Sequence, residues 1–363
     1  MKAPKKSISV LFVLPTLTAG GAERVMSYIA QNLDKSKFKA TILVIGYESE
    51  SRYCVEDVDA VFLNKSRVLL AIPSVFGYLR KSRPDIVMSA IRHMNVVMGL
   101  LSLFFPKIKF IGREVNVMSV LKEYPEETER SYPRFLLNLG FSLLDAIVCQ
   151  SQDMLKDFRT EYPRLQGKLH LINNPITERF KPKTAKPDHK KGFKFITVGS
   201  LEPRKGHLRI LKALAKLDLE YSYMIIGDGS EKAKINNLAQ ELNLQNKLIH
   251  LPFTSDVDKY LSESHIFLQG SYVEGFPNAL LESCAVGTPV VAFKAPGGID
   301  EIVQTGANGF IVENEEEFEE AVFTIINTSG FAPAAVSESV FKKYSAEIIL
   351  TKYEQLFCEM MHT

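Results

Sequence analysis

The feature that most constrains the fold of this 363-residue sequence is an alternation of short apolar runs with amphipathic stretches. In the first half the apolar runs are rich in β-branched residues and almost continuously hydrophobic, as strands buried on both faces of a parallel sheet are. Helical stretches separate several of them, so the pattern predicts βαβ units. The runs expected to be strands are 8–15, 39–46, 85–90, 108–113, 145–150 and 168–174.

The alternation breaks once and then restarts. Residues 175–192 are rich in proline and lysine, which is typical of a linker, although a basic tract could also bind anions. We predict an α/β protein with two Rossmann-like domains, 1–180 and 193–344, joined by a linker at 181–192. A closing helix at 345–363 is expected to pack back on the first domain. The strands of the second domain are expected at 194–200, 221–229, 247–253, 265–270, 288–293 and 308–312.

Composition argues against several classes of protein. The 44 Lys and Arg residues nearly balance the 42 Asp and Glu residues, which does not favour bulk nucleic-acid binding. The four cysteines form no CxxC pair, as expected for single buried thiols in a reducing compartment. No apolar run reaches the roughly 18 residues that span a bilayer. The N-terminus resembles a weak secretory signal, but the same pattern recurs at 194–200, so we interpret it as a buried strand.

Glycines follow predicted strands at three places. Gly20 and Gly21 stand between a strand and a helix, where they suit either a tight turn or a close approach to an anion. The motif VGSLEPRKG places Arg204 and Lys205 after a strand, a position that favours phosphate binding over the alternative of a solvated loop. The motif IIGDG around Gly227 lacks the third glycine of a dinucleotide fingerprint.

The stretch EGFPNALLE places Glu274 in a loop and Glu282 more than one turn inside a helix. Pro277 suits the first helical position, because it has no N–H to leave unpaired. The amides of residues 276–280 would then form an anion site that suits a diphosphate. A charge favoured by the helix dipole explains Glu274, but it does not explain Glu282. Carboxylates on either side of the amides could accept hydrogen bonds from sugar hydroxyls.

Two DxD triplets, at 57–59 and 256–258, could hold a divalent metal on a nucleotide. We interpret the second as a helix N-cap and the first as part of a polar region between strands. The seven histidines show no ligand spacing. We therefore predict no metal site and no cofactor.

These motifs together resemble the family 4 retaining glycosyltransferases of the GT-B fold, in which two Rossmann-like domains face a central cleft. The resemblance rests on GGAERV, EGFPNALLE, AVGTPVV, GGIDEIV and TGANGFIV, which occur in the family's order along almost the whole chain. It implies a transferase that uses a nucleotide diphosphate sugar as donor substrate.

The resemblance also implies roles for individual residues. Glu274 lies near the hydroxyls of the donor sugar, Glu282 binds the ribose, and Lys205 binds phosphate, while Gly20 and Gly21 approach the diphosphate from the other domain. We assign catalysis to Glu274, Lys205 and Arg204. The further donor-binding residues are Gly199, Ser200, Gly227, Pro252, Phe253, Gly275, Phe276, Asn278, Ala279 and Leu280, with Pro252 and Phe253 matching the stretch that usually holds the base.

The chain departs from the family at one position, because Ser200 stands where an arginine is common. Arg204 is the candidate replacement for the lost charge. On the acceptor side the matching residues are His93, Arg113, Glu114 and Asn116.

The predicted reaction moves a sugar, from a UDP-linked donor, to a glycan or lipid-linked acceptor in bacterial polysaccharide or glycoconjugate synthesis. It would be metal-independent and would retain the anomeric configuration by same-face substitution. The alternatives are a sugar-nucleotide epimerase or isomerase of the same architecture and a non-catalytic nucleotide-sugar-binding subunit. The apolar stretch 94–110 with the nearby YLRKSR suggests either a buried helix or contact with an anionic membrane. We predict a cytoplasmic enzyme, peripheral at the inner membrane.

Overall fold

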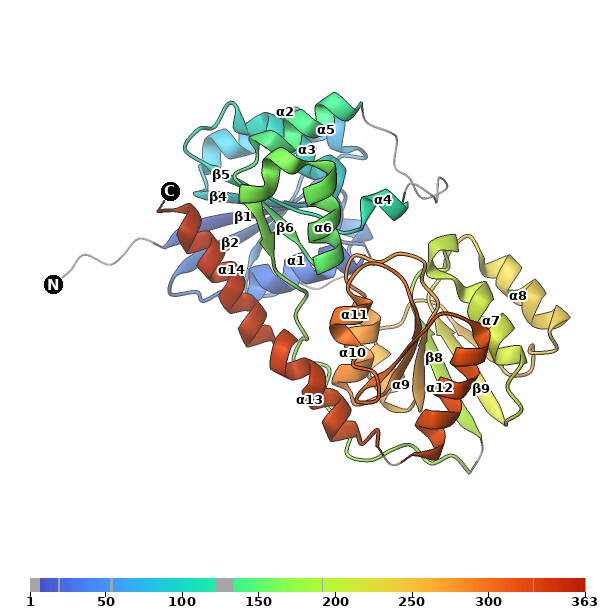
Figure 1. The fold of residues 1–363 in the computed structure, drawn as a ribbon. Helices are drawn as coiled ribbons and strands as arrows, with labels where there is room; N and C mark the ends of the chain where they lie inside the picture. Colours follow the sequence, from blue (N-terminus) through green and yellow to red (C-terminus); the bar gives the residue numbers. More distant parts are fainter. Residues whose placement is uncertain are drawn as a thin grey trace. The chain divides into compact units, whose positions relative to one another are not determined.

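The computed structural model describes residues 7–18, 20–52, 55–121, 133–190, 192–328 and 330–362. The chain divides into two compact units (Figure 1). The first combines most of the chain up to Pro175 with Glu347–Thr363, and the second is mainly Ile176–Ala346. Cys54, expected to be a buried thiol, lies outside the described residues.

The first unit is built on a seven-stranded, all-parallel sheet with the order β3-β2-β1-β4-β5-β6-β7. Strand β1 lies at the point where the strand order reverses, because it pairs with β2 on one side and β4 on the other. In open parallel sheets this reversal is where ligands bind, beyond the carboxyl ends of the strands. The strands are β1 (Ile8–Leu14), β2 (Phe38–Val44), β3 (Asp59–Phe62), β4 (Ile86–Ala90), β5 (Lys109–Arg113), β6 (Ala146–Cys149) and β7 (Leu169–Leu171).

Helices cover both faces of this sheet. Alternate residues of β1, namely Val10, Phe12 and Leu14, share one core with helices α1 and α14, as the two-residue period of a strand requires. On the opposite face a Cβ at Gly112 would touch Asn95 of α3. The helices of the first unit are α1 (Gly21–Asn32), α2 (Val68–Ser82), α3 (Arg92–Ser102), α5 (Arg134–Leu143), α6 (Gln152–Glu161) and α14 (Ala346–Met360), with 3-10 turns η1 (Glu48–Glu50) and η2 (Pro163–Lys168). The short helix α4 (Met118–Leu121) groups with the second unit.

The second unit has a six-stranded parallel sheet with the order β10-β9-β8-β11-β12-β13. Its order reverses between β8 and β11, which pair directly through Ile266 and Phe195. The strands are β8 (Phe193–Val198), β9 (Tyr221–Ile226), β10 (Leu248–Leu251), β11 (Ile266–Gln269), β12 (Val290–Phe293) and β13 (Gly309–Val312).

The helices of the second unit bury their apolar stripes against this sheet in one core. Every residue of β11 and β12 is buried, which explains their nearly continuous hydrophobicity in the sequence. The helices are α7 (His207–Ala215), α8 (Lys232–Glu241), α9 (Val257–Ser262), α10 (Asn278–Ala285), α11 (Ile299–Ile302), α12 (Glu315–Asn327) and α13 (Pro333–Tyr344), with the 3-10 turn η3 (Pro203–Lys205).

Two details differ from the sequence-based expectation. Strand β3 begins at Asp59, within the polar region where no strand was expected, because a four-residue edge strand with partly exposed side chains gives little hydrophobic signal. The expected linker 181–192 belongs to the second unit. Lys183 fastens it there, since its ammonium group donates to Thr288 Oγ1 at 2.7 Å and to the Ser264 carbonyl at 2.8 Å. Burial lowers the pKa of Lys183 to about 7.

Candidate active site

The candidate site lies in the second unit, where the strand order reverses between β8 and β11. The loop after β8 carries η3, and the loop after β11 leads into α10. Because the two strands are parallel neighbours, their carboxyl ends meet at the same edge of the sheet. The fold thus brings together Lys205 and Glu274, which the sequence separates by 69 residues.

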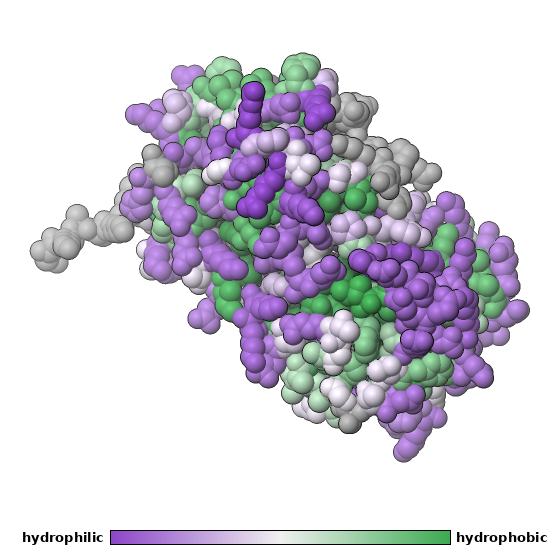
Figure 2. All heavy atoms as spheres, in the orientation of Figure 1, coloured by the Kyte–Doolittle hydropathy of each residue, from purple (hydrophilic) through white to green (hydrophobic). Residues whose placement is uncertain are grey.

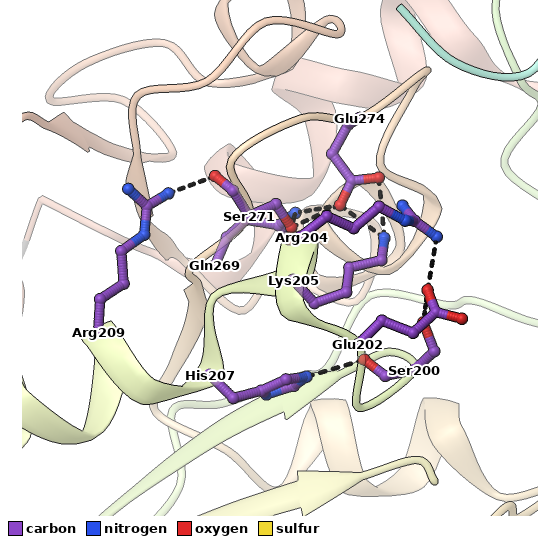
Figure 3. Close-up of polar contacts among 9 residues, drawn as sticks. All are labelled: Ser200, Glu202, Arg204, Lys205, His207, Arg209, Gln269, Ser271 and Glu274. Atoms are coloured by element: carbon purple, nitrogen blue, oxygen red, sulfur yellow. Dashed lines mark hydrogen bonds and ion pairs between the residues drawn. The ribbon is translucent and has the colours of Figure 1, made fainter. Parts of the chain in front are cut away.

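Lys205 and Glu274 form the centre of the site (Figure 3). The Lys205 ammonium group donates to both carboxylate oxygens of Glu274, at 2.7 Å to Oε1 and 2.9 Å to Oε2. Oε1 also accepts from the Ser271 hydroxyl at 2.6 Å and from Gln269 Nε2 at 2.9 Å. Glu274 is only 5% exposed, so these donors replace the water that an ionised carboxylate would otherwise bind.

The charge state of Glu274 follows from two opposed effects. Burial acts to raise its pKa, whereas Lys205, Arg204 and the hydrogen bond from Ser271 lower it. The balance holds the pKa of Glu274 below the ordinary 4.5. At neutral pH the residue is therefore a carboxylate, which suits a hydrogen-bond acceptor for sugar hydroxyls.

Arg204 lies beside this pair, with its guanidinium group between Glu274 and Glu202 in Figure 3. Its Nη2 donates to Glu202 Oε2 at 2.9 Å, and the Ser200 hydroxyl donates to the same oxygen at 2.8 Å. Ser200 therefore does not simply leave a gap where the resemblance leads us to expect an arginine. It helps Glu202 to hold Arg204 close enough to Glu274 to influence its pKa.

The backbones around the site approach closely at two glycines. Gly297 has a φ of +117°, and a Cβ there would lie 2.1 Å from the Glu274 carbonyl oxygen. Gly206 has a φ of +62°, and a Cβ there would lie 1.9 Å from the Gly270 carbonyl oxygen. Only glycine fits both the conformation and the space at these positions. The Gly297-Gly298 turn therefore packs directly against the loop that presents Glu274.

Two further predicted glycines extend the sheet. The Gly199 amide donates to the Ile226 carbonyl at 3.0 Å, and the Gly227 amide donates to the Leu251 carbonyl at 2.9 Å. These N–H groups continue the hydrogen bonding of neighbouring strands. The two glycines thus bring backbone to the edge of the sheet, but their own amides are already paired.

Helix α10 begins one residue later than expected. Pro277 is the N-cap and Asn278 is the first helical residue. Phe276 is 4% exposed and its ring packs edge-on against Tyr344, with ring centroids 5.3 Å apart. Leu280 is also buried, and it packs in the core of the unit with Phe276. Because the side chains of Phe276 and Leu280 pack in the core, only the backbone amides of these residues could face a ligand.

Glu282 is 6% exposed, one turn beyond the start of α10. Asn278 and Ala279, in the first turn, are partly exposed. The first amides of an α-helix have no acceptor within the helix, so this end offers hydrogen-bond donors to an anion. Gly275 is buried in the loop between Glu274 and the helix.

The loop after β10 presents an exposed aromatic ring. Pro252 and Phe253 follow the strand directly, and Phe253 is 53% exposed. An exposed ring at the carboxyl end of a parallel strand is suitable for stacking on a planar ligand.

The predicted residues of the first unit fall into two groups. Gly20 is the N-cap of α1 and Gly21 is its first residue, with the Glu23 carboxylate folded over Gly20. Arg113 and Glu114, expected on the acceptor side, lie in the interior of the unit. His93 is partly exposed, and so is Asn116, which groups with the second unit.

Arg113 and Glu114 take part in a buried polar network. Arg113 Nε donates to the Tyr353 hydroxyl of α14 at 3.2 Å, and its Nη2 donates to Asn174 Oδ1 at 2.5 Å. Glu114 Oε1 accepts from Asn95 Nδ2 at 2.8 Å. These bonds hold strand β5 to α3 and α14, so neither side chain is presented to an acceptor in this structure.

Three residues at the site were not predicted from the sequence, namely Glu202, Gln269 and Ser271. Gln269 gives a retrospective signal, because it is a polar residue at the end of an otherwise apolar buried strand. Ser271 and Glu202 give none, since short polar residues in loops are common.

The described residues contain neither a cluster of metal ligands nor a membrane-spanning helix. No three His, Cys, Asp or Glu side chains among them gather closely enough to hold a metal ion. Likewise, no helix in the described ranges is long and apolar enough to cross a membrane.

Family models and relatives agree on the class of protein. Residues 177–338 match the model described as "Glycosyl transferases group 1", and residues 19–179 match "Glycosyltransferase Family 4". An uncharacterized glycosyltransferase of Haemophilus influenzae is 27% identical over 325 residues, which cover 87% of this chain and 89% of that protein. An N-acetylgalactosaminyltransferase of Campylobacter jejuni that acts on a diphospho-undecaprenol glycan, by its name, is 26% identical over 83% of this chain and 85% of its own.

Solved structures match the whole fold. Anabaena HepE in complex with UDP superposes with a TM-score of 0.78 at 18% identity, over 97% of this chain and 100% of that one. Sucrose-phosphate synthase of Thermosynechococcus elongatus gives a TM-score of 0.80 at 15% identity, over 98% and 100%. The chain therefore has the GT-B fold. The two family matches together span residues 19–338, and the chain belongs to glycosyltransferase family 4.

Proposed function

We propose that this protein transfers a hexosyl group from a UDP-sugar to a glycan or lipid-linked acceptor, with retention of anomeric configuration and without a metal. The observation that carries the proposal is the pairing of the partly buried Lys205 with the buried Glu274 beside the N-terminus of α10. The pair places a cation and a hydrogen-bond-accepting carboxylate next to helix amides, at the point where the strand order of the second sheet reverses. The UDP complex of HepE, which shares the fold, supports the choice of nucleotide.

The diphosphate is the leaving group, so the site must stabilise negative charge that grows on it during the reaction. Lys205 and Arg204 supply two cations, and the amides at the start of α10 add aligned dipoles. Charge stabilisation by such preorganised groups is the usual source of rate enhancement in sites of this kind. In this proposal the two cations and the helix amides together stabilise the charge on the diphosphate without a metal ion.

Glu274 and Glu282 have separate roles in the proposal. Glu274 accepts hydrogen bonds from the sugar, because its carboxylate is ionised and oriented by four hydrogen bonds from Lys205, Ser271 and Gln269. Glu282 accepts from the ribose hydroxyls. The residues Asn278, Ala279 and Phe276 contribute amides, and Phe253 with Pro252 holds the base.

Neither glutamate serves as a covalent nucleophile. Glu274 donates no electron pair to carbon in this scheme, because its two oxygens are held by Lys205, Ser271 and Gln269. Retention then follows from substitution on one face of the sugar. The acceptor oxygen forms the new bond to the anomeric carbon as the bond to the phosphate oxygen breaks, and that phosphate oxygen takes the acceptor proton.

The acceptor class is inferred from relatives. The Campylobacter relative acts on an undecaprenol-linked glycan, and another, from Rhizobium meliloti, is named as a lipopolysaccharide core glycosyltransferase and is 25% identical over 93% of this chain. A lipid-linked acceptor would place the enzyme at the cytoplasmic face of the inner membrane.

The test begins with a thermal-shift panel of nucleotides and nucleotide sugars, because a bound ligand raises apparent stability. Stabilising UDP-sugars are then incubated with acceptor extracts, with and without EDTA. We expect transfer that continues in EDTA and a product with the donor's anomeric configuration. Conversion of the nucleotide sugar without acceptor would instead show an epimerase. Binding without turnover across all acceptors would indicate a non-catalytic subunit.

A further inference from the structure

The exposed apolar side chains of this protein are concentrated on one part of the first unit. Among the described residues, the five large hydrophobic side chains with the greatest exposure all belong to helices α2 and α5 or to the turn that ends α3. They are Leu69 (59%), Leu70 (61%), Leu103 (60%), Phe104 (65%) and Phe135 (66%). Soluble monomers rarely gather such side chains without a binding role.

These residues lie on one packed layer of helices. The Phe76 ring of α2 contacts Phe104 and Phe105 after α3, with ring centroids 5.7 and 5.0 Å apart. Gly99 of α3 and Gly140 of α5 touch, since a Cβ on Gly99 would lie 2.0 Å from the Gly140 carbonyl oxygen. Helix α3 therefore lies between α2 and α5. Figure 2 shows hydrophobic residues along the upper edge, where Figure 1 places these helices.

We call the outer surface of this layer the α2–α5 face, defined by residues 64–84, 92–107 and 133–144. These residues include no aspartate or glutamate, in a chain where acidic and basic residues are otherwise nearly balanced. Arg92 turns inward to Glu114. Six cations make no ion pair with any residue of the described ranges, namely Lys65, Arg67, Arg80, Lys81, Arg83 and Lys107.

We propose that the α2–α5 face docks on an anionic lipid bilayer. Leu69, Leu70 and Phe135 would enter the boundary between headgroups and acyl chains, and the unpaired lysines and arginines would contact lipid phosphates. Exposed Leu and Phe surrounded by charge of a single, positive sign is the composition of helices that lie on membranes. A protein partner is favoured less, because protein interfaces are usually depleted of lysine.

The docking does not depend on the proposed reaction, because none of these residues belongs to the candidate donor site. It can therefore fail or succeed separately from glycosyl transfer. If both hold, the face supplies the membrane contact that a lipid-linked acceptor requires.

The experiment is flotation of the full-length protein with phosphatidylcholine vesicles, with and without phosphatidylglycerol. We expect binding to the anionic vesicles that weakens as salt rises, since screening acts on exposed charges. No binding to anionic vesicles, or equal binding to both compositions, would overturn the proposal.

Two pairs of variants assign the binding to this face. Two double variants should each weaken vesicle binding roughly tenfold or more. One removes apolar side chains (Leu69→Ser/Leu70→Ser), and the other removes positive charge (Arg80→Gln/Lys81→Gln). The matched controls are Met361→Ser, for an exposed apolar side chain elsewhere, and Lys181→Gln/Lys190→Gln, for the same loss of charge on the second unit. All four side-chain sets are exposed, and circular dichroism checks the fold of each variant. Equal weakening of vesicle binding by the control variants would refute the assignment to this face. So would a protein that binds no vesicles but self-associates with rising concentration, if the Leu69→Ser/Leu70→Ser variant abolishes that self-association.

Discussion

Lys205 and Glu274 share two short hydrogen bonds at the point where the second sheet reverses its strand order. Each residue determines the environment of the other, because the carboxylate is buried and the lysine is its main counter-charge. The pair is therefore a structural element and a proposed part of the catalytic machinery. Experiments on it must separate the two effects.

Removing Lys205 should destabilise the protein. In Lys205→Ala the buried Glu274 loses its counter-charge, and we expect a loss of about 2 kcal/mol or more in the free energy of unfolding. Urea denaturation measures it, with Lys294→Ala as control. The Lys294–Glu313 bridge has a similar distance of 2.8 Å but is exposed, so its loss should destabilise the protein far less than the loss of Lys205. The Lys205→Ala/Glu274→Gln double variant should recover part of the loss, and additive losses would contradict the coupling.

The lowered pKa of Glu274 predicts a specific dependence of stability on pH. A carboxyl group with a lower pKa in the folded state adds stability above its unfolded value, here 4.5, and loses it as the pH falls through the folded value. Urea titrations of the wild type and Glu274→Gln at a series of pH values should show a gap that is largest near neutrality. The gap should narrow steadily below pH 4.5. A gap that stays constant down to acid pH would show that Glu274 has no lowered pKa.

Glu282 should govern affinity for the nucleotide. If it accepts hydrogen bonds from the ribose, Glu282→Ala should weaken UDP binding roughly tenfold or more, measured by isothermal titration calorimetry. Glu320→Ala, on an exposed part of α12, is the control and should leave affinity unchanged. Normal affinity in Glu282→Ala would remove the ribose assignment but would leave the role of Glu274 open to its own test.

Gly297 should tolerate no side chain. Gly297→Ala places a Cβ 2.1 Å from the Glu274 carbonyl oxygen, so the loop must shift as well as adopt a strained backbone. Gly306→Ala is a matched control, because its φ is also positive, at +78°, but nothing lies within 4 Å. We expect thermal unfolding to show a larger loss of stability for Gly297→Ala than for Gly306→Ala, by about 2 kcal/mol, together with weaker UDP binding. Equal losses would mean that backbone strain alone matters there.

The raised pKa of Glu23 predicts a dependence of stability on pH that is opposite to that of Glu274. Burial raises its pKa above 4.5, despite hydrogen bonds from its own amide and Thr16 and the nearby charge of Arg113. Its stabilising contribution is therefore present below the unfolded pKa and is lost as pH rises through the folded value. Glu23→Gln should be more stable than the wild type at neutral pH, with little difference in acid. A less stable variant at pH 7 would show that the carboxylate is well compensated in the folded protein.

The fold was predictable to the level of individual strands, because buried parallel strands leave continuous apolar runs that helical periodicity separates. Strand β3 was missed since it is a short edge strand that needs few apolar residues. The location of Glu274, Lys205 and Glu282 could be inferred, because their motifs occupy the ends of strands and the start of a helix.

The contacts between loops could not be predicted. Nothing in GSLEPRKG indicates that Glu202 would accept from both Ser200 and Arg204, because that depends on loop conformations set by tertiary packing. Arg113 and Glu114 illustrate the same limit. Polar residues at the end of a strand suggest a binding site, yet here they serve a buried network. Sequence pattern identifies the edge of the sheet but not which side chains there are presented to solvent.

Helix α14 closes the core of the first unit with residues that follow the second unit in the sequence, including Tyr353 and Phe357. During synthesis the second unit has therefore left the ribosome in full before the first can complete its core. Until then, the surface that α14 covers remains open to chaperones or to another nascent chain. A fragment that ends before Ala346 would leave this surface permanently uncovered. Residues translated after the second unit thus decide when the first unit becomes native.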